Sequence, residues 1–341
     1  MSKFYLIENS LDNYWRAIIL FGRNVASYKF ALAKALLEMG KIENDLVTLE
    51  KLAEPFSRHL CEHLKHSPKQ ITSKSSSFLD ACNKYINNNI TKDELIQITV
   101  NQGFNNVIDA FHIVNRENVP ELFFIDERRQ SQGIRITENF FKLAKDMQFE
   151  NLIHETESRW RLVEESWRLN ISRQLITVDY DQANNVLFTE DENRRVTITS
   201  CRSSLNGYQK GRCFYCYHPI KIEKDTRIDT IDVEVDHFLP WMLNTVLKNI
   251  NGIWNLVLAC QDCNRGENGK FARIPSLKLL KRLHKRNEYL INSHHPLRET
   301  LIRQTGINEN KRISFLQTQY NFAIQQLIHT WEPPKQGVEI F

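Results

Sequence analysis

The sequence lacks the features that mark fibrous, membrane-spanning and nucleotide-driven proteins. Its 341 residues include only 11 glycines and 9 prolines, too few for a collagen-like or low-complexity chain. The best apolar run near the start, 17–22, is six residues long, whereas a membrane-spanning helix needs about 20. No Gly-rich phosphate loop and no Gly-x-Ser-x-Gly motif occurs. Since no signal peptide follows Met1, we expect a globular protein of the cytoplasm without a membrane segment.

Cysteine is scarce and unevenly placed, which argues against a secreted scaffold held by disulfides. There are seven cysteines, whereas a disulfide framework pairs an even number. Four of them form two pairs with two residues between the partners, Cys213/Cys216 and Cys260/Cys263. In a reducing compartment this spacing indicates a structural zinc ion held by four thiolates. The remaining three are interpreted as buried thiols: Cys61, Cys82 and Cys201.

Positive charge is concentrated in one stretch of the chain. The formal net charge is only +4, yet residues 265–312 contain twelve Lys or Arg against four Asp or Glu. A basic patch confined to one segment is typical of a phosphate-binding surface. A helix is predicted over 276–291, and its basic residues are predicted to contact a nucleic-acid backbone: Lys278, Lys281, Arg282, Lys285 and Arg286.

Apolar periodicity predicts helices in the first half of the chain. Residues 13–37 carry an apolar stripe at helical spacing with a mild interruption at Gly22. Another helix is predicted over 45–65, with a break before Pro55 as an alternative. Four more are predicted over 75–88, 92–115, 137–148 and 151–170. Residues typical of strands then follow at 175–180, 186–189 and 195–199.

The two cysteine pairs enclose an insertion with its own pattern. They are 43 residues apart, more than the roughly 15–20 of a compact zinc ribbon. Inside the insertion, apolar residues at 231, 233 and 235 alternate with acidic ones, which predicts a half-buried strand that ends near Pro240. His237 therefore lies at a strand end. A second, apolar strand over 252–260 leads to the second cysteine pair.

In this order, the residues resemble the HNH endonuclease family, whose domain is also called the His-Me finger. The resemblance covers about 212–275 and rests on Cys-x-x-Cys, then Asp236-His237-x-x-Pro240, then Asn255, then Cys-x-x-Cys followed by Asn264. It implies a hairpin and a helix that bind one divalent metal ion. It also implies that Asn255 holds the intervening loop through backbone hydrogen bonds and so orients His237.

Hydrolysis of a phosphodiester needs a base that activates water and a cation that neutralises the phosphoryl oxygens. His237 is the candidate base, because a neutral imidazole accepts a proton near pH 7. Asp236 and Asn264 are the candidate ligands of a catalytic Mg²⁺ or Mn²⁺, since hard cations prefer oxygen donors. Asn264 stands where the family often has histidine. Lys270 and, as second choice, Arg265 are the candidate phosphate-binding residues.

The expected fold class is mainly α with a small α+β part. A helical recognition or partner region is expected at 1–172, a strand-rich linker at 173–199, a zinc-braced HNH domain of the ββα-metal type at 200–275, and a basic helical segment at 276–341. The expected function is metal-dependent cleavage of DNA, and a large extra region beside such a domain resembles bacterial restriction and anti-phage defence proteins. The alternatives are a zinc-dependent nucleic-acid-binding module without catalysis and an RNA-directed nuclease.

Overall fold

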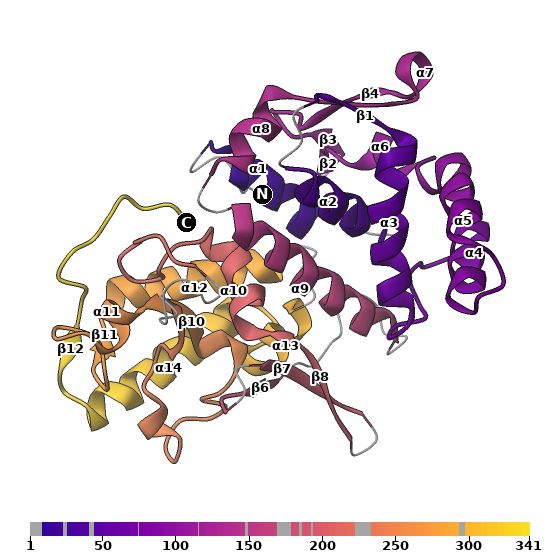
Figure 1. Ribbon diagram of the computed structural model, residues 1–341. Coiled ribbons are helices and arrows are strands. Elements are labelled where there is room, and N and C mark those ends of the chain that lie inside the picture. The colour runs from indigo at the N-terminus through magenta and orange to yellow at the C-terminus, as the bar shows by residue number, and fades with distance from the viewer. Residues whose placement is uncertain are drawn as a thin grey trace. The chain divides into compact units, whose positions relative to one another are not determined.

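A computed structural model describes residues 9–22, 26–40, 44–73, 75–114, 116–146, 149–168, 179–183, 186–191, 194–221, 233–292 and 297–341. The chain divides into two compact units, Met1–Asn170 and Ile171–Phe341. Both units consist mainly of helices with small sheets (Figure 1), which confirms the predicted mainly α class with a small β part. The four predicted regions and their borders stay predictions. Within the described ranges, no helix combines the length and the apolar character that a membrane crossing requires.

The first unit packs its helices around buried aromatic rings. Trp15 on α1 (Leu11–Phe21) is fully buried and meets the rings of Phe111, Phe123 and Phe140. Edge-on and tilted contacts of this kind are the arrangements that aromatic quadrupoles favour. The long helices beside α1 in this unit are α2 (Tyr28–Glu38), α3 (Leu49–Leu64), α4 (Ser77–Ile86) and α9 (Phe149–Arg168).

Short elements complete the first unit. Its sheet has the order β1-β5-β4, with β5 (Gly133–Ile136) antiparallel to both β1 (Leu46–Thr48) and β4 (Phe124–Glu127). A second antiparallel pair joins β2 (Ile113–Val114) to β3 (Glu117–Asn118). The short helices are α5 (Lys92–Ile98), α6 (Val107–Ala110), α7 (Arg128–Ser131) and α8 (Glu138–Ala144).

The structure corrects two of the predicted helices and one alternative. The stripe over 13–37 forms two helices, α1 and α2, rather than one. The helix predicted over 92–115 ends early: α5 leads into a π-helical turn, Thr99–Gly103, and α6 and β2 follow. Pro55 does not break α3 but lies inside it. Hydrophobic periodicity therefore locates the apolar, mostly helical stretches, but it does not show where a helix is interrupted.

One histidine of the first unit is buried as a neutral group. His112 is almost fully buried, and its Nε2 accepts a hydrogen bond from the backbone N–H of Phe123 (3.0 Å). An imidazole nitrogen that accepts a hydrogen bond carries no proton, so the ring is neutral. Burial lowers the pKa of His112 to about 3.

The second unit begins its described part with a small sheet and a helix. The sheet has the order β6-β7-β8, all antiparallel: β6 (Asp179–Asp181), β7 (Val186–Asp191) and β8 (Arg194–Ser200). These strands overlap the three predicted stretches, although 175–178 lies outside the described residues. The helix α10 (Cys201–Gln209) follows directly and leads to the first cysteine pair.

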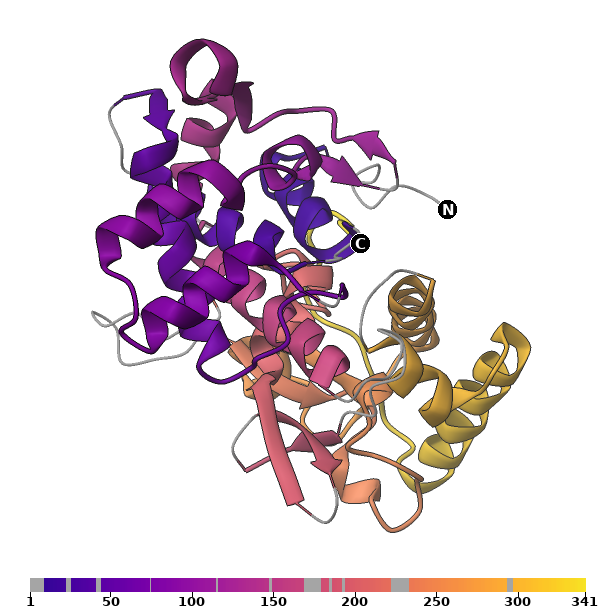
Figure 2. The same ribbon diagram turned by 90° about the vertical axis from the view of Figure 1, so that its right-hand side faces the viewer.

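A hairpin forms the centre of the second unit. β9 (Val233–His237) is antiparallel to β10 (Leu256–Cys260), and α11 (Gln261–Arg265) follows at once, so that two strands and a helix succeed one another. The start of the predicted first strand, at 231–232, lies outside the described residues. Three helices from α12 onward pack on one another (Figure 2): α12 (Leu277–Ile291), α13 (Arg298–Thr305) and α14 (Glu309–Gln326).

The last residues of the chain return to α10 and the first cysteine pair. β12 (Thr330–Trp331) pairs in parallel with β11 (Ile274–Pro275). Beyond it, the Phe341 ring packs against Tyr208 of α10 and against Phe214. Lys210 Nζ donates to the Ile340 carbonyl (3.0 Å). Residues about 130 positions apart in sequence are thus in direct contact.

Candidate functional site

The four paired cysteines come together in one cluster. Cys213 and Cys216 follow α10, Cys260 ends β10, and Cys263 lies in α11. Their sulfur atoms all lie within 4.8 Å of one another, and Sγ of Cys216 is 3.7 Å from Sγ of Cys260. Tetrahedral zinc with Zn–S bonds of about 2.3 Å places sulfurs about 3.8 Å apart. The four thiols therefore fit a tetrahedral metal ion such as zinc.

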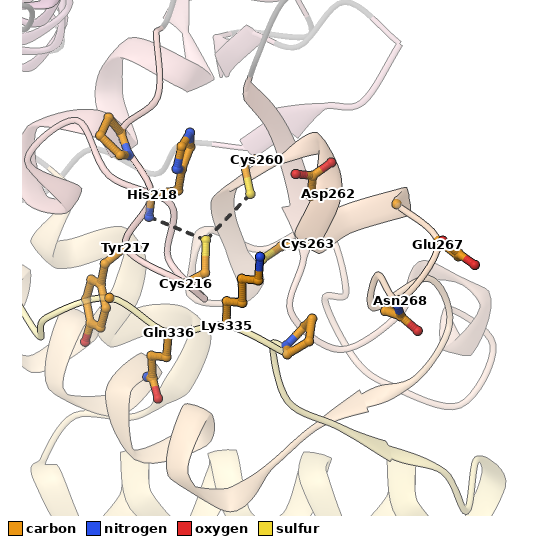
Figure 3. Close-up of a pocket in the computed structure, with 14 residues that line it drawn as sticks. Cys216, Tyr217, His218, Cys260, Asp262, Cys263, Glu267, Asn268, Lys335 and Gln336 are labelled. Carbon is orange, nitrogen blue, oxygen red and sulfur yellow. Dashed lines mark hydrogen bonds between the residues drawn. The ribbon is translucent and has the colours of Figure 1, made fainter.

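The four thiols of the cluster differ in how readily they ionise. Hydrogen bonding within the cluster, first of all from Cys213, lowers the pKa of Cys216 and brings that of Cys260 to about 7. Burial raises the pKa of Cys213, and hydrogen bonding to Cys213 raises that of Cys263. The backbone N–H of His218 donates to Sγ of Cys216 (3.4 Å). Figure 3 shows the Lys335 side chain extending toward the sulfurs across a cavity of about 690 Å³. The His218 N–H compensates negative charge on Sγ of Cys216.

Two buried arginines of α12 brace this cluster and the hairpin. Arg282 Nη1 donates to the carbonyls of Phe214 (2.5 Å) and Tyr215 (2.9 Å), between the first two cysteines. Arg286 donates to three carbonyls at the start of β10: Leu256 (3.0 Å), Ile253 (3.1 Å) and Trp254 (3.2 Å).

The prediction that Arg282 and Arg286 contact a nucleic-acid backbone is wrong, because both side chains are buried on the apolar face of the helix. Lys278, Lys281 and Lys285 are exposed, as that prediction requires. Lys278 donates to Gln336 (3.0 Å), and Lys285 lies 3.6 Å from the Glu339 carboxylate.

His237 is the last residue of β9 and faces a loop asparagine. Its Nε2 lies 2.8 Å from Oδ1 of Asn251. A carbonyl oxygen only accepts, so with this amide orientation Nε2 carries the proton and Nδ1 is left as the basic nitrogen. Burial lowers the pKa of His237 below its ordinary value, which keeps the ring neutral near pH 7. The side chain is therefore in the form that can accept a proton.

Asp236 is buried and already has two polar partners. Tyr215 Oη donates to its Oδ2 (2.6 Å), and Lys270 Nζ lies 3.2 Å from its Oδ1. Burial raises the pKa of Asp236, although Lys270 and Tyr215 act in the opposite direction. Lys270 is only 1% exposed and also donates to the His237 carbonyl (2.9 Å). The ammonium group thus fixes the end of β9, and its predicted role in phosphate binding stays a prediction.

Asn255 ties together the loop that separates the two strands. Its Nδ2 donates to the carbonyls of Leu239 (3.0 Å) and Ile250 (2.9 Å), and its Oδ1 accepts from the Leu239 N–H (2.8 Å). The side chain is fully buried. Three hydrogen bonds from one amide hold both ends of the loop 239–250, and Asn251 follows directly. The orientation of His237 depends on this loop.

Asn264 and Arg265 converge on an acidic residue that the sequence reasoning did not single out. Asn264 Nδ2 donates to Glu234 Oε2 (2.7 Å), while Arg265 Nη2 lies 2.5 Å from Glu234 Oε1. The structure thus pairs Asn264 with Glu234 and Asp236 with Lys270. Arg265 is 61% exposed, so its remaining N–H groups are open to solvent.

Sequence reasoning also missed two further residues of the site. Asn251 precedes a glycine, which is a turn signal and no sign of contact with a histidine. Tyr215 lies inside the first Cys-x-x-Cys, where the sequence alone suggests a buried aromatic of the core. Only the structure shows that its hydroxyl donates a hydrogen bond to Asp236.

Comparison of the chain with protein-family models, with curated proteins and with solved structures gives no match.

Proposed function

We propose that this chain is a metal-dependent endonuclease of the HNH type that hydrolyses phosphodiester bonds in DNA. The observation that carries the proposal is His237, neutral at the end of β9, with Nε2 engaged by Asn251 and Nδ1 left as a base. It lies in a hairpin followed at once by a helix, beside a cysteine cluster that fits zinc. The order and spacing of these residues support the same assignment.

The residues divide the reaction among them. His237 Nδ1 takes a proton from water, and the water oxygen attacks phosphorus. The bond to the 3′ oxygen breaks and that oxygen takes up a proton from solvent, which leaves 5′-phosphate and 3′-hydroxyl ends. Mg²⁺ or Mn²⁺, when bound, would supply positive charge for the phosphoryl and leaving oxygens. Asp236 and Asn264 would hold it, since Asp236 keeps unused acceptor positions and Asn264 has an amide oxygen.

In this proposal the protein binds DNA through the phosphates of its backbone. The three exposed lysines of α12 offer positive charge, and Arg265 offers a fork of N–H groups that suits phosphate oxygens. Phosphate contacts do not read bases, so an RNA-directed nuclease stays the nearest alternative. The first unit would recognise a partner protein or a feature of the nucleic acid, as in restriction or anti-phage defence.

One observation favours the second candidate, a zinc-dependent nucleic-acid-binding module without catalysis. The Asp236 carboxylate is buried and already faces the Lys270 ammonium group, and this arrangement reduces its attraction for a cation. Both candidates, the binding module and the endonuclease, would use the four-cysteine cluster and the exposed lysines of α12. They differ in whether cleavage occurs and whether it depends on His237.

The decisive experiment is plasmid nicking with Mg²⁺ or Mn²⁺, with RNA of matched length in parallel. We expect His237→Ala to lose at least about 100-fold in cleavage rate, because removal of a positioned base costs that much or more. Its zinc content and DNA affinity should match the wild type. His329→Ala, which changes an exposed histidine of the same unit, is the matched control. Absence of cleavage by the wild type on either polymer would support the binding module instead.

A further inference from the structure

Glu234 connects the two groups that the proposed reaction would place around the phosphate. Its carboxylate is 18% exposed, and each of its oxygens has a partner: Asn264 on one side and Arg265 on the other. Glu234 and Asp236 are two positions apart on β9 and therefore face the same side of the strand. The carboxylate thus lies next to the candidate cation ligands without taking the place of either.

The hydrogen bond from Asn264 decides which end of its amide is turned outward. A carboxylate only accepts, so the NH₂ group must face Glu234 and the carbonyl oxygen must face away from it. No described residue donates a hydrogen bond to that oxygen. Without this hydrogen bond the amide would populate both orientations before a cation binds, so that fixing the oxygen outward would use part of the binding free energy.

The backbone of Asn264 is fixed independently of this side chain. Its neighbour Cys263 belongs to the sulfur cluster, and the Asn264 carbonyl accepts from the Phe271 N–H (2.9 Å). The side chain itself is only half-buried, and one hydrogen bond orients it. Loss of Glu234 would therefore release the amide and leave the fold around it intact.

We propose that Glu234 is a positioning residue that holds the Asn264 amide with its oxygen toward a divalent cation and holds Arg265 beside it. This inference rests on the proposed function, because it concerns the same cation. Glu234 acts through Asn264, since its own two oxygens are already engaged. In metal sites, removal of a residue that orients a ligand weakens metal affinity about 10- to 100-fold.

Mn²⁺ binding to the zinc-loaded full chain tests the proposal without cleavage. Affinity is measured by electron paramagnetic resonance of free Mn²⁺ in the His237→Ala background. We expect Glu234→Ala to weaken Mn²⁺ binding about 10- to 100-fold, and Glu234→Gln, whose amide oxygen still accepts from Asn264, to stay within about fivefold of the parent. Glu267→Ala removes an exposed negative charge nearby and should change little.

A double-mutant cycle shows whether the effect passes through Asn264. In an Asn264→Ala background, Glu234→Ala should cause no further loss of Mn²⁺ affinity. The proposal is overturned if Glu234→Ala binds Mn²⁺ like the parent, if Glu234→Gln is as weak as Glu234→Ala, or if the loss persists without Asn264. Zinc content equal to that of the parent verifies that each variant is folded. No Mn²⁺ binding by the parent itself would instead refute the cation site and with it the proposed function.

Discussion

Replacement of Arg286 by methionine should destabilise the second unit, and the size of the effect follows from its surroundings. The guanidinium group is 2% exposed and donates to three backbone carbonyls around the start of β10. The Ile253 carbonyl keeps the Leu256 N–H as a partner and the Trp254 carbonyl keeps Asn287 Nδ2 (3.3 Å), so only the Leu256 carbonyl depends on Arg286 alone. Hydrogen bonds from a charged donor contribute about 1.5–3 kcal/mol each, so the loss of all three amounts to roughly 4.5–9 kcal/mol. This loss of hydrogen bonds lowers the free energy of unfolding.

The substitution also has a stabilising effect, because methionine removes the cost of burying the charged guanidinium group. Burial lowers the pKa of Arg286 from 12.5 to about 10, and that shift corresponds to about 3 kcal/mol that methionine would recover. The net expectation is a decrease of roughly 1.5–6 kcal/mol in the free energy of unfolding, in the lower part of that range because two of the three carbonyls keep another partner. Packing of the methionine stem replaces part of the apolar contact.

Urea unfolding should be followed in two ways, by circular dichroism and by release of zinc to a coloured chelator. Zinc release reports on the second unit alone, because the sulfur cluster lies there. Lys281→Met changes an exposed residue of the same helix and should alter the free energy of unfolding by less than about 0.5 kcal/mol. If Arg286→Met unfolds at the same urea concentration as Lys281→Met, the bracing role of this arginine is refuted.

Three more predictions follow from the same contacts. Cys213→Ser should remove tightly bound zinc and unfold the second unit, because zinc ligation contributes directly to folding; a wild-type protein without zinc by metal analysis would contradict this. Changing Lys278, Lys281 and Lys285 to Gln should reduce the slope of log affinity against log salt on duplex DNA by up to about 2.7, and an unchanged slope would place the DNA elsewhere. For His112, neutral when folded, the unfolded state binds the extra proton as pH falls below about 6.5, so stability is lost toward acid. Between pH 7 and pH 5 this histidine should account for about 2 kcal/mol, which His112→Asn should abolish, and an equal pH dependence in both proteins would refute the assignment.

The sequence predicts features set by local spacing, and it does not predict the contacts between side chains that are far apart along the chain. The spacing of two residues between cysteines identifies both pairs, and alternation on a strand places Glu234 and Asp236 on one face. Neither pattern contains the partners of these side chains. Asn264 meets Glu234 across 30 positions, and Lys270 reaches the Asp236 carboxylate across 34. Such pairs depend on how the hairpin and α11 fold back on one another.

The helix α12 is a second case in which the sequence predicts the element but not the partners of its side chains. Its charge and period predict α12 correctly, and the periodicity even separates its two faces. Charge alone cannot tell which arginines face solvent. Arg282 and Arg286 share the face of Leu279 and Leu283, and backbone carbonyls of other segments accept hydrogen bonds from both guanidinium groups, which offsets the cost of burying their charge. Identifying those carbonyls requires the tertiary structure.

The return of Phe341 to α10 has a practical consequence for protein engineering. The segment from α10 onward starts and ends at the same place, since Tyr208 and Phe341 are in ring contact. Segments with adjacent ends tolerate circular permutation and insertion into a host loop. New ends can be opened at Ile307, which is exposed between α13 and α14. The zinc-binding hairpin can then be carried as a cassette in which α14 and the last residues precede α10, while the four cysteines keep their order along the chain.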